Sequence, residues 1–466
     1  MSLIKESSLY MVGRGIPALI SFVAIVVYTH LLEPEEYGYF SLVVVSVALF
    51  NSVFFHWLRF GLSRFRVRYE HKEIDFLSVI FFTFILLLVI TGLIGVLAWQ
   101  VLSNEIWQGL ILVAVLVLWG QAWAELNLEL LRSRFKAWHY SALSVLKAGF
   151  ALLLGVVLIR YGFGEYGPLI GLVIATLLST FIVSRKAWVD VKLKLAKQET
   201  VKELLRYGLP LSATAIFAFV VSSTDRFMIA SILGVDKAGM YAPSYDIAQQ
   251  SLGIMMLAIY LAGFPRIVST LEGENKNEVQ KKLKAYFSLF LTIALPAVVG
   301  FMVLAPNIAT VLLGEAYQQS AMNIMPIIAI ATLFSGIKAY YLDMSFQLSE
   351  VTVALIWIAA VSAVVNVILN ILWIPVYGLE GAAYATLISY VVSAALSLYF
   401  GRQKMKIPLF SKSIIKIGVS LFVIIVVIMY LPVPEVVIGG LLGLIYQGCV
   451  VVVVYSLTLY ITHYLL

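Results

Sequence analysis

Charged residues are scarce in this chain. They make up 12% of its 466 residues, about half of the roughly 25% that is usual in soluble domains. Hydrophobic residues make up 62%, and residues 76–98 and 436–461 contain no charged side chain. About 20 apolar residues are enough for a helix to cross a hydrocarbon core of about 30 Å, whereas the short alternating segments of a membrane β-barrel are missing. We therefore predict an all-α integral membrane protein.

Cysteine and histidine are also rare, which excludes several kinds of site. The single cysteine, Cys449, rules out an intramolecular disulfide and a cysteine metal cluster. The five histidines stand singly at predicted membrane edges, at His30, His56, His71, His139 and His463. The chain has no Walker-type phosphate loop, and its longest predicted connection has 22 residues, at 185–206. An ATPase module or another soluble domain is therefore not expected.

Apolar stretches predict fourteen membrane-spanning helices. They lie at 10–32, 38–57, 76–98, 106–131, 139–160, 168–184, 207–233, 240–263, 284–306, 320–343, 351–373, 381–400, 414–431 and 436–461. The first stretch is too long for a signal-peptide core, and we expect it to be retained. With the N-terminus in the cytoplasm, the inner connections hold 25 lysines and arginines and the outer ones hold two. The positive-inside rule therefore predicts a multi-pass protein of the cell (inner, cytoplasmic) membrane with both termini in the cytoplasm.

A weak internal repeat and the charge pattern divide the chain into two halves. Leu32 and Gly38 recur as Leu233 and Gly239, at the second span of each half. The expected domains are an N-terminal lobe of six helices at 1–189, a cytoplasmic interfacial linker at 190–206, a C-terminal lobe of six helices at 207–400 and two additional helices at 401–466. Transporters are often built from such repeats, with the substrate path at the interface of the halves.

Several ionisable side chains fall inside the predicted spans, where each costs roughly 2.5–3.5 kcal/mol at the helix centre. The basic ones are Arg14, Lys147, Arg226 and Lys338, and the acidic ones are Glu125, Glu129, Asp225 and Asp246, with Asp343 at the cytoplasmic end of its span. Such groups normally face a partner or a watery cavity. Those near the cytoplasmic edge, which are Arg14, Glu129 and Lys338, can also reach the interface by snorkelling.

Two pairs of these side chains have a geometry that their spacing defines. Glu125 and Glu129 are four residues apart and share one helix face, at a depth similar to that of Lys147. A structural salt bridge between neighbouring spans therefore competes with a functional role. Asp225 and Arg226 are adjacent, and adjacent helical residues point about 100° apart, so we expect each of them to have its own partner.

Four stretches, taken in order, resemble the polysaccharide flippases of the multidrug/oligosaccharidyl-lipid/polysaccharide (MOP) exporter superfamily. They are THLLEPEEYGYFSLV at 29–43, STDRFMIASILGVDKAGMYAPSYDIAQ at 223–249, GEAYQQSAMNIMPIIAI at 314–330 and IPVYGLEGAAYATLISY at 374–390. The resemblance implies a fold like that of the multidrug (MATE) exporters, with about 14 transmembrane helices in two pseudo-repeated six-helix lobes and two C-terminal helices. It also implies a Wzx-type transporter that flips a polyprenyl-diphosphate-linked oligosaccharide to the outer leaflet by alternating access, for a surface polysaccharide such as O-antigen.

The resemblance further implies roles for the intramembrane charges. The candidates for binding the headgroup in the cavity are Arg14, Lys147, Arg226 and Lys338. The candidates for support or ion coupling are Asp225, Glu125, Glu129 and Asp246. No cofactor or metal site is expected, and coupling to a Na⁺ or H⁺ gradient stays open. The expected partners are the lipid-linked oligosaccharide, membrane lipids and polysaccharide polymerase machinery, with no nucleic acid.

Two other functions compete with this interpretation. The first is an ion-coupled multidrug or small-molecule antiporter of the same superfamily, which would need acidic rather than basic side chains along the path. The second is a membrane glycosyltransferase, which would need a catalytic acid or base and sizeable outer loops. Because the longest predicted outer connection has 13 residues, at 307–319, we expect that the protein is not an enzyme.

Overall fold

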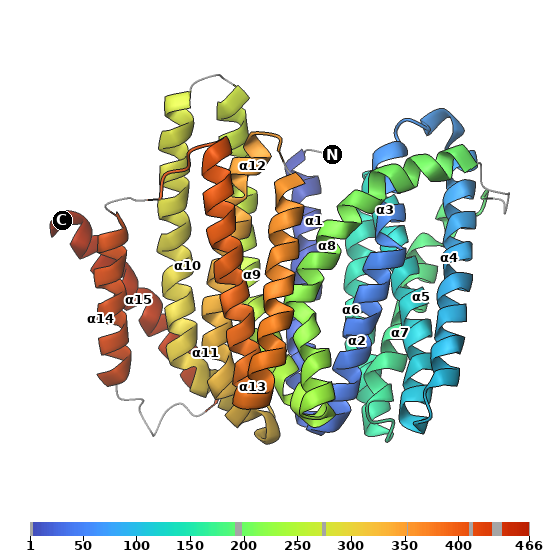
Figure 1. Ribbon diagram of the computed structural model, residues 1–466, viewed down its shortest axis with the longest axis horizontal. Helices are drawn as coiled ribbons and strands as arrows, with labels where there is room; N and C mark the ends of the chain where they lie inside the picture. The colour runs from blue at the N-terminus through green and yellow to red at the C-terminus, as the bar shows by residue number, and fades with distance from the viewer. Residues whose placement is uncertain are drawn as a thin grey trace. The chain divides into compact units, whose positions relative to one another are not determined.

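The computed structural model describes residues 3–191, 198–272, 276–351, 353–409, 413–430 and 440–465 (Figure 1). These residues are almost entirely helical and form no β-strand. Among them, twelve helices are long and apolar enough to span a membrane. The prediction of an all-α integral membrane protein is therefore confirmed. The chain divides into two compact units, Met1–Phe219 and Val220–Leu466.

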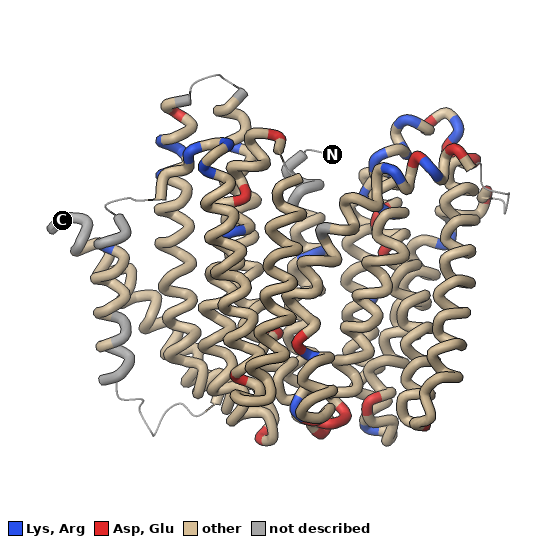
Figure 2. The backbone as a smooth tube through the Cα atoms, viewed as in Figure 1, with Lys and Arg blue, Asp and Glu red and all other residues tan. Residues whose placement is uncertain are grey.

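The first unit contains seven complete α-helices and the beginning of an eighth within the described residues. They are α1 (Leu3–Leu31), α2 (Pro34–Phe54), α3 (His56–Phe65), α4 (Glu73–Val101), α5 (Glu105–Ser133), α6 (Ala137–Arg160), α7 (Tyr166–Ser184) and the first part of α8 (Gln198–Ile232), with short 3₁₀ turns at Glu70–Lys72 and Arg185–Ala187. Lysine and arginine gather mainly at one end of these helices (Figure 2). This asymmetry is typical of membrane helices and their cytoplasmic connections.

Helices α1 and α6 run parallel and in direct contact. Ser141 Oγ donates to the Leu9 carbonyl at 2.6 Å, and Tyr28 Oη donates to the Ala151 carbonyl at 3.3 Å. The first contact joins the beginnings of the two helices, and the second joins residues further along both of them. Arg14 and Lys147 therefore lie on neighbouring helices that point in the same direction.

The short helix α3 corrects the sequence analysis, which placed residues 58–75 in a connection. Its buried residues Trp57, Leu58 and Leu62 form one apolar face. This face packs on the beginning of α8, where Gly208 closely approaches the Trp57 carbonyl. The predicted surface segment 190–206 thus ends in the first residues of α8, while 192–197 lie outside the described residues. Because α3 packs on α8, its residue Arg59 lies against the other helices of the first unit instead of in an exposed connection.

The second unit contains the rest of α8 and the C-terminal helices. They are α9 (Val235–Glu272), α10 (Lys276–Leu312), α11 (Glu315–Ile337), the π-helix Lys338–Leu342, α12 (Met344–Leu348), α13 (Val353–Lys404), α14 (Ser413–Tyr430) and α15 (Leu441–Leu465). α13 has 52 residues but is two helices, because Gly378 has the non-helical angles φ 61° and ψ −136°. A positive φ of this kind favours glycine. The predicted spans 351–373 and 381–400 lie on either side of it, and the total of fourteen spans stays a prediction.

Corresponding helices of the two halves begin alike. Gly38 lies four residues after Pro34, the first residue of α2, and Gly239 lies four residues after Val235, the first residue of α9. Both glycines are buried. The proposed lobes place residues 207–233 together in the second half, whereas the boundary between the compact units falls within α8 after Phe219. The division into lobes stays a prediction.

Candidate functional site

Glu125 on α5 is the centre of a polar cluster in the first unit. Its carboxylate forms an ion pair with Arg59 of α3 and accepts hydrogen bonds from Asn51 Nδ2 at 3.0 Å and Gln121 Nε2 at 3.1 Å. Arg59 Nη1 also donates to Asn51 Oδ1 at 3.1 Å. The structure thus pairs Glu125 with an arginine that the sequence analysis had assigned to a connection, while Lys147 forms no ion pair with it. Nothing in the sequence distinguished Arg59 from the other basic residues around it.

Glu129 is paired with a basic residue of its own helix. Its Oε1 lies 2.7 Å from Arg132 Nη2, one turn further along α5. Both residues are near the end of the helix, and the Arg132 side chain is 45% exposed. An ion pair in this position contributes about 0–1 kcal/mol. The local contact therefore accounts for Glu129 without a role in transport.

Lys147 and Arg14 differ from the other basic candidates. Across the part of the chain that the structure describes, neither forms an ion pair, and no hydrogen bond of either is found. Lys147 is partly buried near the middle of α6, whereas Arg14 is exposed on α1. An ammonium group in this position is costly unless water or a ligand solvates it. Of the candidates, Lys147 is therefore the best placed to receive an anionic ligand.

Asp225 and Arg226 on α8 each have a separate side-chain partner on α9, as their spacing predicts. Tyr241 Oη donates to Asp225 Oδ2 at 2.7 Å, and the Arg226 guanidinium forms an ion pair with Asp246. The Arg226 guanidinium carbon also lies 5.6 Å from the centre of the Tyr245 ring. Asp225 is fully buried, and the Arg226 side chain is 8% exposed. The charge of Arg226 is thus largely compensated where it stands.

Lys338 opens the π-helix that follows α11. Its Nζ lies 2.7 Å from Asp343 Oδ2, and Ser397 Oγ donates to Asp343 Oδ1 at 2.7 Å. The carboxylate is nearly buried, at 9% exposure. π-Helical turns are frequent at functional sites, but here the turn brings a lysine onto a carboxylate. Lys338, like Arg226, is therefore a compensated cation.

A buried polar cluster lies between the two parts of α13. Asn366, Asn370 and Thr386 are fully buried, and Asn370 Nδ2 donates to Asn366 Oδ1 at 3.0 Å. Among the described residues, Asn366 Nδ2, Asn370 Oδ1 and Thr386 Oγ1 have no hydrogen-bond partner. Thr386 Oγ1 faces the hydroxyl of Tyr241, the partner of Asp225, but in a geometry too poor for a regular hydrogen bond. Since an unsatisfied buried polar group costs about 1–3 kcal/mol, the cluster is suited to bind water or a small polar ligand.

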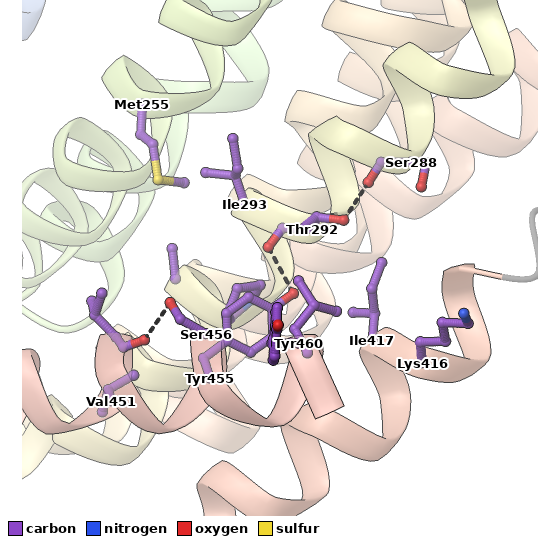
Figure 3. A pocket seen from close by; sticks show the side chains of 14 residues that line it. Met255, Ser288, Thr292, Ile293, Lys416, Ile417, Val451, Tyr455, Ser456 and Tyr460 are labelled. Atoms are coloured by element: carbon purple, nitrogen blue, oxygen red, sulfur yellow. Dashed lines mark hydrogen bonds between the residues drawn. The ribbon is translucent and has the colours of Figure 1, made fainter. Parts of the chain in front are cut away.

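An apolar cavity of about 730 Å³ lies between α9, α10, α14 and α15 (Figure 3). Its walls include Met255, Ile293 and Val451, and among the described residues that line it Lys416 of α14 is the one with a charge. Tyr455 Oη donates to the Thr292 carbonyl at 2.8 Å and so holds α15 against α10. The sequence analysis overlooked Lys416, although it is the only charged residue of α14.

Comparison with known proteins identifies similar chains. A family model described as "Polysaccharide biosynthesis protein" matches residues 27–322. A putative O-antigen transporter of Shigella flexneri is 23% identical over 419 residues, which are 85% of this chain and 97% of the transporter. A Klebsiella pneumoniae protein, described as an uncharacterized membrane protein in the cps region, is 22% identical over 82% of this chain and 78% of its own length.

Two solved structures have similar folds. The lipid II flippase MurJ in an inward closed conformation has a TM-score of 0.77 at 17% identity and covers 98% of both chains. An inward-facing multidrug MATE transporter of the MOP superfamily has a TM-score of 0.63 at 16% identity, over 84% of this chain and 97% of its own. At this level of identity the likeness concerns the fold.

Proposed function

The chain belongs to the polysaccharide biosynthesis protein family, and we propose that it flips a polyprenyl-diphosphate-linked oligosaccharide from the cytoplasmic to the outer leaflet. The MOP-type fold expected from the sequence is confirmed. The observation that carries the proposal is the family match to a chain whose described residues are nearly all membrane helix. A protein of this kind contributes to polysaccharide synthesis most directly by moving an intermediate across the membrane. It does not act as an enzyme.

The proposed substrate explains why charges lie inside the membrane. A sugar headgroup with two phosphates would lose its hydrogen bonds to water in the hydrocarbon core, at a cost of several kcal/mol for each group. A hydrated path with basic side chains replaces those bonds, and charge-assisted bonds to phosphate are the stronger kind. We assign the first contacts to Arg14 and Lys147, because neither is bound to a carboxylate in the described structure. Arg226 and Lys338 would reach the headgroup only in competition with Asp246 and Asp343.

The lateral cavity suits the lipid part of the same substrate. Its apolar walls and its volume of about 730 Å³ would accept a stretch of polyprenyl chain. Apolar pockets of 300–1,000 Å³ commonly bind small apolar ligands. Lys416 at its border would attract the nearby phosphate, so we add Lys416 to the candidates for binding the headgroup.

The buried side chains of Asp225, Asn370 and Thr386 are our candidate ligands for a coupling cation. A carboxylate, an amide and a hydroxyl all offer oxygen ligands, which hard cations prefer, and the Asn370 and Thr386 oxygens have no hydrogen-bond partner by geometric criteria among the described residues. When bound, the cation would supply positive charge that compensates the buried carboxylate. The residues present therefore fit Na⁺, and Asp225 is the residue on which the site depends.

Sodium is expected to raise the melting temperature of the purified protein, whereas the same concentration of potassium is not. A ligand at 100 times its Kd stabilises the native state by about 2.7 kcal/mol. Asp225→Asn should abolish the difference between the two ions, and Asp236→Asn, a change of an exposed carboxylate in the first turn of α9, should retain it. A sodium-dependent shift of the melting temperature that persists in Asp225→Asn would show that Na⁺ does not bind at these residues.

The topology and the partners of the protein belong to the same proposal. We assign the protein to the inner membrane with both termini in the cytoplasm, because basic residues dominate the predicted inner connections. The two six-helix lobes, joined by the segment 190–206, would rock around the substrate path. Polysaccharide polymerase machinery would receive the flipped lipid on the outer side.

An ion-coupled antiporter is the second candidate function, and it is favoured by the likeness to the MATE fold. Reconstituted vesicles separate the two functions. The protein is expected to move a fluorescent polyprenyl diphosphate oligosaccharide into reach of an added quencher, and to leave a trapped organic cation inside. Exchange of the organic cation against Na⁺ or H⁺, with the lipid left in place, would assign the antiporter function instead.

A further inference from the structure

The charge arrangement in the first unit leaves one deeply placed cation available. Glu125 is bound by Arg59, and Glu129 is bound by Arg132. Lys147 therefore has no carboxylate left in this group of side chains. Of the three cations Arg59, Arg132 and Lys147, only Lys147 has a charge that neither of these two carboxylates neutralises. This arrangement depends on the ion pair between Arg59 and Glu125.

Glu125 is the carboxylate of the preceding helix α5 that lies at nearly the level of Lys147. Helices α5 and α6 are joined by a short turn, and Glu125 lies eight residues before Ser133, the last residue of α5. Lys147 lies ten residues after Ala137, the first residue of α6. At 1.5 Å per residue these distances are about 12 Å and about 15 Å from the turn, so both side chains lie at nearly the same level. Lys147 also lies close enough to Arg59 for their two charges to interact.

The Arg59 contacts are those of a residue held in place. Its side chain is 12% exposed, it pairs with Glu125, and it donates to Asn51 Oδ1 at 3.1 Å. The buried face of α3 fixes the helix that carries it. Gln121 and Asn51 fill further acceptor positions of the Glu125 carboxylate. The carboxylate is thereby turned toward α2 and α3.

We propose that Arg59 is a positioning residue, which binds Glu125 and so keeps the Lys147 ammonium free for the diphosphate of the substrate. The inference rests on the proposed function and deepens it. Without Arg59, the freed carboxylate would pair with Lys147 and exclude the phosphate. Arg59 thus determines the affinity for the headgroup without itself touching the headgroup.

The test is the binding of farnesyl diphosphate to the full-length protein in detergent, measured on the monodisperse, folded fraction. Arg59→Ala is expected to weaken binding at least about tenfold, which equals 1.4 kcal/mol. The double variant Arg59→Ala/Glu125→Gln should return to within about threefold of the wild type, because no carboxylate is left to occupy Lys147. Arg59→Lys should recover most of the affinity, since a lysine also neutralises Glu125. Arg64→Ala, on the exposed side of α3, is the matched control.

A double-mutant cycle separates this role from a merely structural one. Lys147→Gln should weaken binding in the wild type but add little in the Arg59→Ala background, where Lys147 is already occupied. Additive losses would overturn the inference. So would a folded Arg59→Ala protein that binds like the wild type, or a double variant that stays as weak as Arg59→Ala. A wild type that does not bind farnesyl diphosphate would count against the proposed function itself, and the inference would fall with it.

Discussion

Replacing Lys147 with glutamine is expected to slow lipid flipping by about 10- to 150-fold. A hydrogen bond to a charged group contributes about 1.5–3 kcal/mol. Because the Lys147 ammonium has no carboxylate partner in the described structure, its replacement leaves no carboxylate unpaired. The measurement is the initial rate at which a fluorescent polyprenyl diphosphate oligosaccharide becomes accessible to a quencher in reconstituted vesicles. Lys237→Gln, which removes a lysine with a 45% exposed side chain at the beginning of α9, is the matched control and should keep the wild-type rate.

The stability of the Lys147→Gln protein distinguishes a binding role from a structural one. Because an ammonium without an ion-pair partner is costly inside the membrane, its removal should leave the melting temperature unchanged or raise it. A slower rate with an unchanged melting temperature would place the defect in transport. A variant that flips lipid at the wild-type rate would contradict the role assigned to Lys147.

Replacing Arg226 with alanine is expected to destabilise the protein by up to about 3–5 kcal/mol, the cost of removing one partner from a buried ion pair, because Arg226 is 8% exposed and Asp246 is 24% exposed. The Asp246 carboxylate, which Arg226 binds, would then have to stay charged without its cation or take up a proton. The measurement is the melting temperature of the purified protein. Arg206→Ala, an exposed arginine on the same helix α8, is the control and should melt with the wild type.

A second variant tests whether the ion pair is the cause. Arg226→Gln/Asp246→Asn removes both charges and should recover most of the stability that Arg226→Ala loses. If Arg226→Ala were as stable as the wild type, the pair would have no structural importance, and Arg226 would have to be reassigned to direct contact with substrate.

The membrane fold could be predicted from the sequence because it depends on composition and on the length of apolar runs. A run such as 76–98 has no alternative to a helix inside a bilayer, and it lies within α4. Even the division of α13 was predicted, because residues 374–380 include the turn at Gly378. The short helix α3 was missed for two reasons. Four of its residues are basic or polar, as in a cytoplasmic connection, and the helix has only ten residues, too few to span a membrane.

The partners of the charged residues were harder to predict, because pairing depends on which helices are neighbours. The separate partners of Asp225 and Arg226 followed from the angle between adjacent helical residues, a local property. The pairing of Glu125 with Arg59 did not follow, since it joins residues 66 positions apart through the fold of α3. Lys416 could have been found from the sequence, because a single lysine in an apolar helix is unusual.

The most direct test of the central claim is a vesicle assay that compares the wild type, Lys147→Gln and protein-free vesicles. Each preparation contains a fluorescent polyprenyl diphosphate oligosaccharide in both leaflets, and a membrane-impermeant quencher is added outside. The account predicts that in protein-free vesicles only the outer-leaflet fluorescence is lost. With the wild type the inner-leaflet fluorescence should follow, and with Lys147→Gln it should follow much more slowly. Inner-leaflet fluorescence that stays protected in the presence of folded wild-type protein would contradict the assignment of this chain as a lipid-linked oligosaccharide flippase.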